Sequence, residues 1–289
     1  MKKVFRHKST WMIILVLVLA APLIYGYAMM SSFIWSDKEI TEYFKNKISP
    51  SFKTYMVNGR SVFYASAGND TLPMVLFIHG APGSWYDFIE YFGDSNLISQ
   101  THLVAPDRPG YGRSGEGDFI TSIEAQSNMI EPLLHLNKSK QPLMLVAHSY
   151  GGPIAVKLAT DHPDRIKCML LIAPQIDPGN EKQFAIDKLA DVEVLQRMMP
   201  KMWLAAYHEK KTHIDELKKM DEAWEKISIP VIYMHGLEDQ IVSPENARFA
   251  KLKFTNAPMD MITFPNENHF IPWTRQDSVT RIILSNTRE

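Results

Sequence analysis

The stretch PLMLVAHSYGGPIAVKL at residues 142–158 decides the fold. Its apolar first part predicts a buried strand and its second part a helix, so that Ser149 occupies the corner between them. A serine on such a strained turn has its hydroxyl pushed outwards, and the N–H of Tyr150 faces the point where an oxyanion would form. The close approach of strand and helix requires small flanking residues, which Ala147 and Gly151 supply. The pattern predicts a nucleophilic serine.

Four further segments each follow a predicted strand. They are HGAPG at 79–83, DRPGYGRS at 107–114, HGLED at 235–239 and NHF at 268–270. Together with the serine corner, and in this order, they resemble the α/β-hydrolase fold superfamily. The resemblance extends from about Phe52 to the C-terminus.

This resemblance implies a catalytic triad in the chain order Ser149, Asp239, His269. His269 is expected to act as the base, because a serine hydroxyl is a poor nucleophile at neutral pH without one. Asp239 is expected to orient the imidazole and to stabilise its charged form. Asp177, which follows an earlier strand, is the reserve candidate for the acid.

The oxyanion hole is expected to consist of the backbone N–H groups of Ala81 and Tyr150. Residues 79–85 resemble the H-G-x-P-G-S-W loop of epoxide-hydrolase-like members of the superfamily, which have an aspartate nucleophile. The serine at position 149 favours acyl transfer through a serine ester instead. Trp85 is expected either to form a pocket wall or to pack at the start of a helix.

The remaining pattern predicts an α/β fold with a mostly parallel sheet and helices on both faces. We expect the core to comprise residues 51–174 and 229–289, with a linker helix within 36–50. Residues 175–228 lack any strand-like run, and the resemblance implies a helical cap over the active site. An Asn-Gly pair at 58–59 predicts a hairpin turn.

Apolar residues recur at helical spacing in the predicted cap, and they either cover a substrate pocket or pack on the main domain. Tyr150 is expected to line the site as well. The residues predicted to form the substrate pocket are Trp85, Met199, Trp203, Phe270 and Trp273.

Residues 1–35 form a separate N-terminal segment. A basic start precedes an uncharged stretch from Ser9 to Trp35, which is long enough to cross a bilayer. The positive charges would keep the N-terminus in the cytoplasm and place the catalytic domain on the extracytoplasmic side, periplasmic or at the cell surface. A cleaved signal peptide, giving a secreted enzyme, is the alternative; Gly26 and Ala28 are small enough for a cleavage site.

Net charge, cysteine content and residue spacing argue against nucleic-acid binding, an internal disulfide and a metal site. The net charge of −1 provides no field for nucleic acid. The single cysteine, Cys168, cannot form an internal disulfide, and we find no His/Cys spacing typical of a metal site. We therefore expect neither a cofactor nor a metal.

The sequence thus predicts a serine hydrolase of carboxylesterase type, acting on a carboxylic ester or thioester of a small, largely apolar acyl substrate. The first alternative is an amidase or aminopeptidase-like hydrolase, with an acidic cap residue holding the substrate amine. The second is a non-catalytic binding protein with the same fold. The acidic cap candidates for the first alternative are Glu181, Asp187, Asp191 and Glu193.

Overall fold

A computed structural model of the protein describes residues 20–22, 24–182 and 190–287. Its centre is an eight-stranded sheet of order β1-β2-β4-β3-β5-β6-β7-β8. β2 is antiparallel to both β1 and β4, and the other pairs are parallel, which confirms the predicted mostly parallel sheet. The strands are β1 (Ser51–Val57), β2 (Arg60–Ala67), β3 (Met74–Ile78), β4 (His102–Pro106), β5 (Leu143–His148), β6 (Ile166–Ile172), β7 (Val231–Gly236) and β8 (Met259–Phe264).

Two features of the sheet follow directly from the sequence. β3 and β5 are buried along their whole length, as continuous apolar runs in a sheet covered on both faces must be. The predicted hairpin joins β1 and β2, with Val57 opposite Arg60. Its turn residues Asn58 and Gly59 have φ angles of 50° and 74°, the conformation that an Asn-Gly hairpin turn requires.

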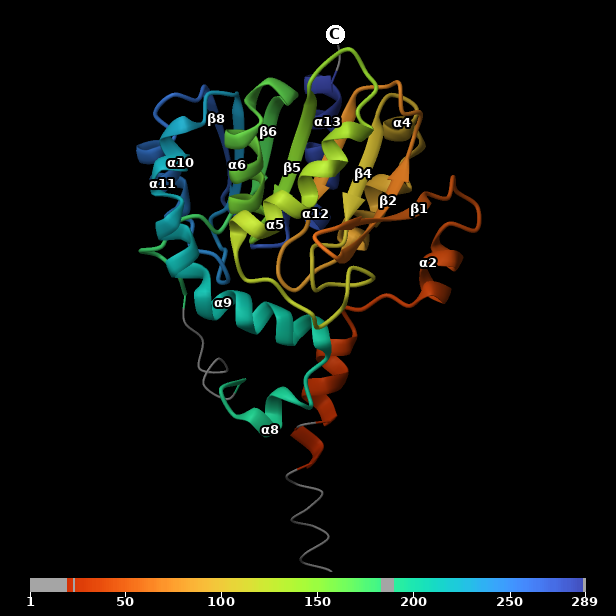
Figure 1. The fold of residues 1–289 in the computed structure, drawn as a ribbon, viewed down its shortest axis with the longest axis vertical. Helices are drawn as coiled ribbons and strands as arrows, with labels where there is room; N and C mark the ends of the chain where they lie inside the picture. The colour runs from red at the N-terminus through yellow and green to blue at the C-terminus, as the bar shows by residue number, and fades with distance from the viewer. Residues whose placement is uncertain (1–19, 23, 183–189, 288–289) are drawn as a thin grey trace, which may run out of the picture.

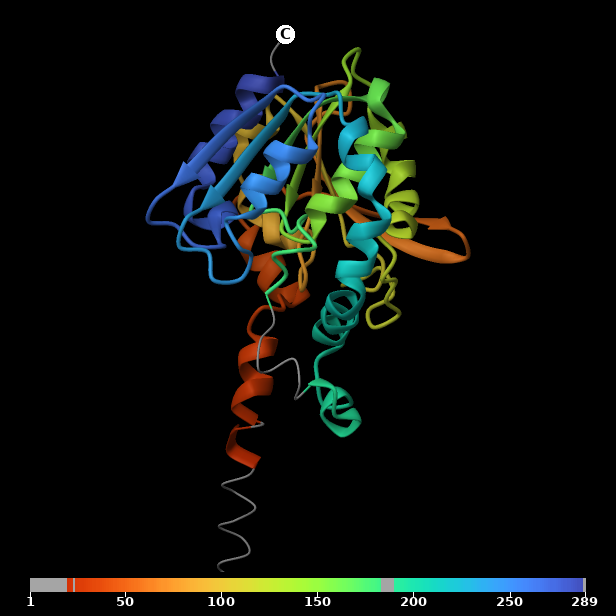
Figure 2. The same ribbon diagram turned by 90° about the vertical axis from the view of Figure 1, so that its left-hand side faces the viewer.

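Helices pack on both faces of the sheet (Figures 1 and 2). One face is covered by α5 (Ile123–Ile130), α6 (Gly151–Asp161), α10 (Asp221–Lys226) and α11 (Asn246–Lys253), with the short turns η2 (Glu131–Leu136) and η3 (Pro163–Arg165) beside them. The other face is covered by η1 (Trp85–Phe88), α3 (Ile89–Phe92), α4 (Ser95–Ile98), α12 (Ile271–Thr274) and α13 (Gln276–Thr287).

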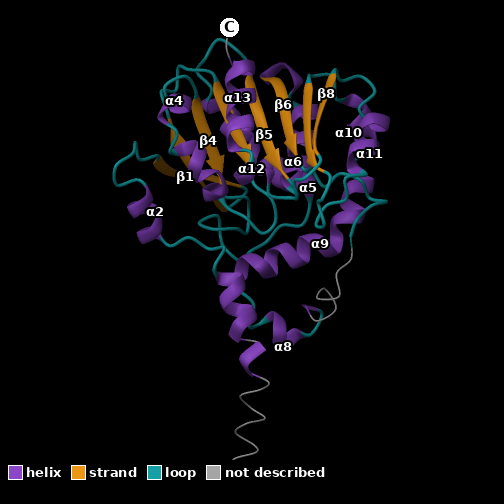
Figure 3. Ribbon diagram, turned by 180° about the vertical axis from the view of Figure 1, so that it is seen from behind, coloured by secondary structure: helices purple, strands orange, loops and turns teal. Residues whose placement is uncertain are grey.

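The predicted cap segment contains α8 (Glu193–Gln196), α9 (Lys201–Lys219) and α10. α9 lies across the carboxyl edge of the sheet, and α8 lies farther out (Figures 1 and 3). Pro200 stands at the start of α9, so the apolar stripe expected from the sequence is divided between two helices. α10 instead covers the sheet, because Trp224 is buried in the main core.

The N-terminal part of the described chain is helical over residues 24–31 and is followed by α2 (Asp37–Tyr43). Ser36 and Glu39 form a reciprocal capping box at the start of α2. Within residues 20–22, 24–182 and 190–287, no helix combines the length and apolarity needed to cross a bilayer. Residues 1–19 and 23, which include the first eleven positions of the predicted membrane-spanning stretch, lie outside the described residues.

Candidate active site

Ser149 occupies the tight turn between β5 and α6. Its φ angle is 52°, in the left-handed region that non-glycine residues rarely adopt. The turn is tight because α6 begins against the end of β3: a Cβ atom on Gly151 would lie 2.4 Å from the carbonyl oxygen of Ile78. Glycine is therefore required at position 151. The side chain of Ser149 sits at the carboxyl end of β5 and is almost fully buried.

A carboxylate and an imidazole meet at the ends of the two strands beyond β6. His269 Nδ1 lies 2.7 Å from Asp239 Oδ2. An ionised carboxylate can only accept, so Nδ1 carries the proton and the neutral ring has its Nε2 free to take up another. The other oxygen, Oδ1, accepts from the N–H groups of Ile241 and Val242, each at 2.8 Å. These contacts hold the carboxylate in one orientation.

The Asp239 carboxylate has a third partner, His235, whose Nε2 lies 3.2 Å from Oδ2. Burial alone would raise the pKa of Asp239, but hydrogen bonds from His235 and His269 outweigh it and lower the pKa below its usual range. Asp239 is therefore ionised throughout the neutral pH range.

His269 lies beside the serine turn. Its carbonyl oxygen is 3.1 Å from Nε2 of His148, and the two imidazole rings are 4.7 Å apart. Burial and the neighbouring His269 lower the pKa of His148 to about 3, so His148 stays neutral. Among the hydrogen bonds of the described residues, none joins the Ser149 hydroxyl to His269; such contacts in unliganded enzymes commonly form only with substrate bound.

Asp177, the reserve acid, has its carboxylate turned into its own loop. It accepts from the N–H of Gly179 at 2.8 Å and from Nδ2 of Asn180 at 2.5 Å. Since His269 pairs with Asp239, the geometry favours Asp239 over Asp177 as the orienting acid.

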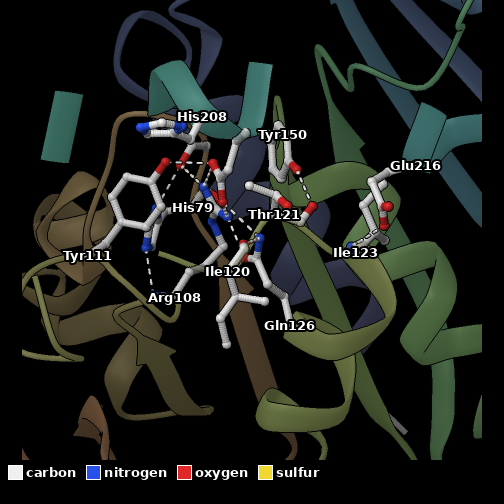
Figure 4. A network of polar contacts seen from close by, with 12 residues as sticks. His79, Arg108, Tyr111, Ile120, Thr121, Ile123, Gln126, Tyr150, His208 and Glu216 are labelled. Carbon is white, nitrogen blue, oxygen red and sulfur yellow. Dashed lines mark hydrogen bonds and ion pairs between the residues drawn. The ribbon is translucent and has the colours of Figure 1, made fainter. Parts of the chain in front are cut away.

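The loop after β3 lies directly against the serine turn. A Cβ atom on Gly80 would lie 3.0 Å from the Cβ of Ser149, so Gly80 permits the close approach. His79 and Arg108 fix this loop: the N–H of Arg108 donates to His79 Nε2 at 2.8 Å, and His79 Nδ1 donates to the Gly80 carbonyl at 2.8 Å (Figure 4). Ala81 packs against the cluster formed by Tyr111 and two residues of α9, Met202 and Ala205.

Two of the predicted pocket residues face elsewhere. Trp85 is buried in the core between Phe52 and Phe92, as the packing alternative predicted. Its backbone N–H donates to the Asp107 carboxylate. Trp203 contacts the N-terminal segment: its Nε1 donates to the carbonyl oxygen of Met30 at 3.0 Å. Neither ring is directed at Ser149 by these contacts, because a run of apolar and aromatic residues does not specify which surface it meets.

Two other predicted pocket residues, Phe270 and Trp273, lie beside the imidazoles of the candidate site. Trp273 stands edge-on to His148 at 5.4 Å, and Phe270 stands edge-on to His269 at 6.0 Å. Both rings are exposed to about 40%. Met199 is half-buried in the loop that leads into α9. An exposed aromatic pair beside the imidazoles is suited to an apolar substrate.

Sequence reasoning missed a buried acid–base pair in the cap. His213 Nδ1 lies 3.2 Å from Glu181 Oε2, and both side chains are shielded from solvent. Glu181 also accepts from Gln175 and Lys210. The His213 ring packs 4.6 Å from the ring of Tyr150. The residues are 32 positions apart in a charged stretch, so only the folded chain reveals the pair.

Comparison with known proteins identifies the fold. The family model described as alpha/beta hydrolase fold matches residues 73–202. The thioesterase domain from the curacin biosynthetic pathway superimposes with a TM-score of 0.64, at 20% identity, over 82% of this chain and 100% of that domain. The family model and the structural similarity show that the chain has the α/β-hydrolase fold. A membrane phospholipase A, described as a bacterial virulence factor, shares the fold with a TM-score of 0.62, at 17% identity, over 96% of this chain and 97% of that one.

Curated α/β-hydrolase sequences are similar over shorter spans. Lipase LipV of Mycobacterium tuberculosis is 26% identical over 178 residues, which is 61% of this chain and 60% of the lipase. Epoxide hydrolase 3 of Siraitia grosvenorii is 32% identical over 130 residues, which is 44% of this chain and 40% of that enzyme. The chain therefore spans about half the length of these relatives. Both of these relatives are hydrolases by name, one a lipase and the other an epoxide hydrolase.

The described part of the chain holds no group of three or more His, Cys, Asp and Glu side chains placed to bind a metal ion. The ionisable residues around Ser149 pair with one another instead. The chemistry that this arrangement can perform is proton transfer between a hydroxyl and an imidazole next to backbone donors.

Proposed function

We propose that this α/β hydrolase is a serine esterase that cleaves carboxylic esters or thioesters of small, largely apolar acyl groups through Ser149, Asp239 and His269. The observation that carries the proposal is the 2.7 Å hydrogen bond from His269 Nδ1 to buried Asp239, beside a serine with a left-handed backbone. That bond leaves His269 Nε2 as a base next to the serine turn.

The reaction follows from these positions. Ser149 Oγ attacks the carbonyl carbon while His269 Nε2 takes its proton, and the resulting oxyanion accepts from the N–H groups of Ala81 and Tyr150. Collapse expels the alcohol or thiol, which receives the proton from His269, and leaves an acyl-enzyme. Water then attacks the acyl carbon with the same base, releasing the acid and restoring Ser149. No cofactor takes part in this scheme.

Acidic cap residues favour the ester over the amide alternative, because those described already have partners. Glu181 binds His213, Gln175 and Lys210, and Asp191 accepts from Tyr207 and Lys211. Glu193 pairs with Arg197 within α8, and Asp187 lies outside the described residues. Each of the three described carboxylates is thus already paired with a cationic side chain.

We also propose that the N-terminal segment associates with a membrane and holds the catalytic domain on the extracytoplasmic side. The observation behind this is an apolar helical surface over residues 24–31: Ile24 and Tyr25 are exposed to 67% and 72%. Fractionation of cells expressing the full chain, followed by carbonate washing, tests it. Recovery in the washed membrane supports the proposal, and recovery in a soluble fraction contradicts it.

The substrate class is tested with p-nitrophenyl esters of increasing acyl length beside aminoacyl-anilides. The proposal expects turnover of short and medium esters, little turnover of anilides, and loss of activity in Ser149→Ala. Faster turnover of anilides would support the amidase alternative. No turnover of either class, with no reaction of Ser149 towards an acylating probe, would support a non-catalytic binding protein.

A further inference from the structure

Arg108 lies fully buried between the loop after β3 and the cap helix α9 (Figure 4). All five of its side-chain N–H groups have acceptors. Nε donates to the carbonyl of His79 at 3.0 Å, and Nη2 donates to the carbonyl of Gly80 at 2.8 Å. Nη1 donates to Gln126 and to Glu209, both at 2.6 Å, and Nη2 also donates to Glu209 at 3.1 Å.

The hydrogen bond to Gly80 has a geometric consequence for the next residue. The Gly80 carbonyl and the Ala81 N–H belong to one peptide group, and this peptide is trans, so the two point in opposite directions. Arg108 and His79 both donate to that carbonyl, each at 2.8 Å. Fixing the carbonyl therefore also fixes the direction of the Ala81 N–H.

The negative partner of Arg108 comes from the cap. Glu209 on α9 is fully buried, and its carboxylate also accepts from the Tyr111 hydroxyl at 2.5 Å and from Gln126 Nε2 at 2.8 Å. The rings of Tyr111 and Tyr150 lie 4.5 and 4.9 Å from the guanidinium. A buried guanidinium that loses its carboxylate is strongly destabilised and must find other acceptors or water. The placement of Arg108 thus depends on α9 being docked.

We propose that Glu209 is a positioning residue that couples the cap to the oxyanion hole. By pairing with Arg108, Glu209 holds the Gly80–Ala81 peptide in the orientation that directs the Ala81 N–H at the oxyanion, so the hole is complete only when α9 is docked. The inference rests on the proposed esterase function. The inference predicts that loss of Glu209 lowers kcat, through weaker stabilisation of the transition state, and leaves substrate binding nearly unchanged.

The test compares two carboxylates of the same helix. Glu209→Gln removes the charge opposite Arg108, whereas Glu216→Gln removes a second largely buried carboxylate that accepts from the N–H of Ile123 and does not contact the loop after β3. Both variants, with wild type and Ser149→Ala, are assayed for kcat and KM on one p-nitrophenyl ester and for inhibition by an alkylboronic acid. Thermal melting controls for the loss of a buried interaction.

Glu209→Gln is expected to lower kcat by roughly 10- to 1,000-fold, while KM changes less than about threefold. The upper value is the effect of losing one oxyanion donor completely. Affinity for the boronic acid should fall with kcat, while Glu216→Gln should stay within about threefold of wild type in both. Equal kcat values in the two variants would overturn the inference. Activity that survives in Ser149→Ala would instead overturn the proposed function.

Should Glu209→Gln fail to fold, Tyr111→Phe serves in its place. It removes only the hydroxyl that donates to Glu209 and keeps the ring beside Arg108. A fall in kcat of about 3- to 10-fold at unchanged KM supports the inference. This is the size of effect expected from losing one charge-assisted hydrogen bond. A wild-type kcat in this variant contradicts it.

Discussion

Two buried polar clusters flank Ser149, and they are built in different ways. The first joins Asp239 and His269, which lie on loops directly after neighbouring strands of one sheet. The second joins Arg108 to Glu209, which are 101 positions apart and meet only where the cap helix crosses the sheet edge. The loops at the strand ends supply both side chains of the first cluster, whereas the second depends on docking of a separate helix.

This difference separates two kinds of control over one reaction. The carboxylate of Asp239 is held by backbone N–H groups of its own loop as well as by imidazoles. The cap segment reaches Asp239 only at its main chain in the described residues, where Lys182 Nζ donates to the Asp239 carbonyl at 2.9 Å. The loop that carries Ala81 is held through Arg108, which forms a buried ion pair with Glu209. Changes in the first cluster should therefore abolish proton transfer, and changes in the second should reduce oxyanion stabilisation.

The largest effect is expected within the first cluster. Ser149→Ala and His269→Ala should each lower kcat by roughly 10⁴- to 10⁶-fold, and the double variant should be no worse, because the two residues act as a unit. Steady-state kinetics on a p-nitrophenyl ester measures this. Strictly additive losses would show that the two side chains act independently.

Asp239→Asn should lower kcat by about 10⁴-fold while the chain still folds. The amide can present an N–H to His269 Nδ1 and so favours the wrong tautomer of the imidazole. The matched control is Asp177→Asn, which should leave kcat nearly unchanged because the Asp177 carboxylate accepts from Gly179 and Asn180 of its own loop. The reverse result, loss in Asp177→Asn only, would transfer the acid role to Asp177.

Acid should lower the stability of the folded protein through His148, which lies beside the first cluster. Burial holds the folded pKa of His148 at about 3, while the unfolded chain protonates near 6.5. The unfolded state thus binds more protons, and stability falls as pH decreases from about 6.5 to about 3, by on the order of a few kcal/mol. Asp239, whose folded pKa is lowered, adds a further loss as pH falls below its unfolded value.

Chemical denaturation of wild type and His148→Gln between pH 7 and pH 4 measures the His148 contribution. The variant should show the flatter pH dependence. Parallel curves for the two proteins would contradict the assignment of a neutral, buried His148.

The smallest effect is expected at the exposed aromatic rings. Trp273→Ala should raise KM for an apolar ester several-fold with little change in stability, because the ring is 40% exposed. Trp85→Ala is the contrasting variant: it empties a core site and should cost about 3–5 kcal/mol of stability. Kinetics and denaturation of both variants distinguish the two roles. A larger increase in KM in Trp85→Ala than in Trp273→Ala would show that Trp85 lines the substrate pocket.

The first cluster could be predicted from the sequence because its geometry is local. Each member follows an apolar run that forms a parallel strand, and the carboxyl ends of such strands meet at one sheet edge. The small residue at position 151 and the glycine at 80 mark close backbone approaches that the structure shows. The apolar runs at 74–79, 102–106, 142–148, 167–173, 230–235 and 259–264 predict strands, and the observed strands end within a residue of these limits.

The cap could not be predicted in the same way, because helical periodicity identifies an apolar face but not its partner. Trp203 meets the N-terminal segment, and α10 joins the core through Trp224. Glu209 and His213 appear in the sequence as members of a charged stretch, yet both are buried against partners far along the chain. Only the packing of α9 decides which of its charges are shielded from water.

The central claim is that Ser149 forms a covalent ester during turnover, and an alkyl fluorophosphonate tests it most directly. Intact-mass and peptide mass spectrometry of the labelled full chain should show one adduct, on the peptide that contains Ser149. Ser149→Ala should remain unlabelled, and His269→Ala should label far more slowly. An adduct on another residue, or a wild-type protein that stays unlabelled while it still turns over an ester, would contradict the account.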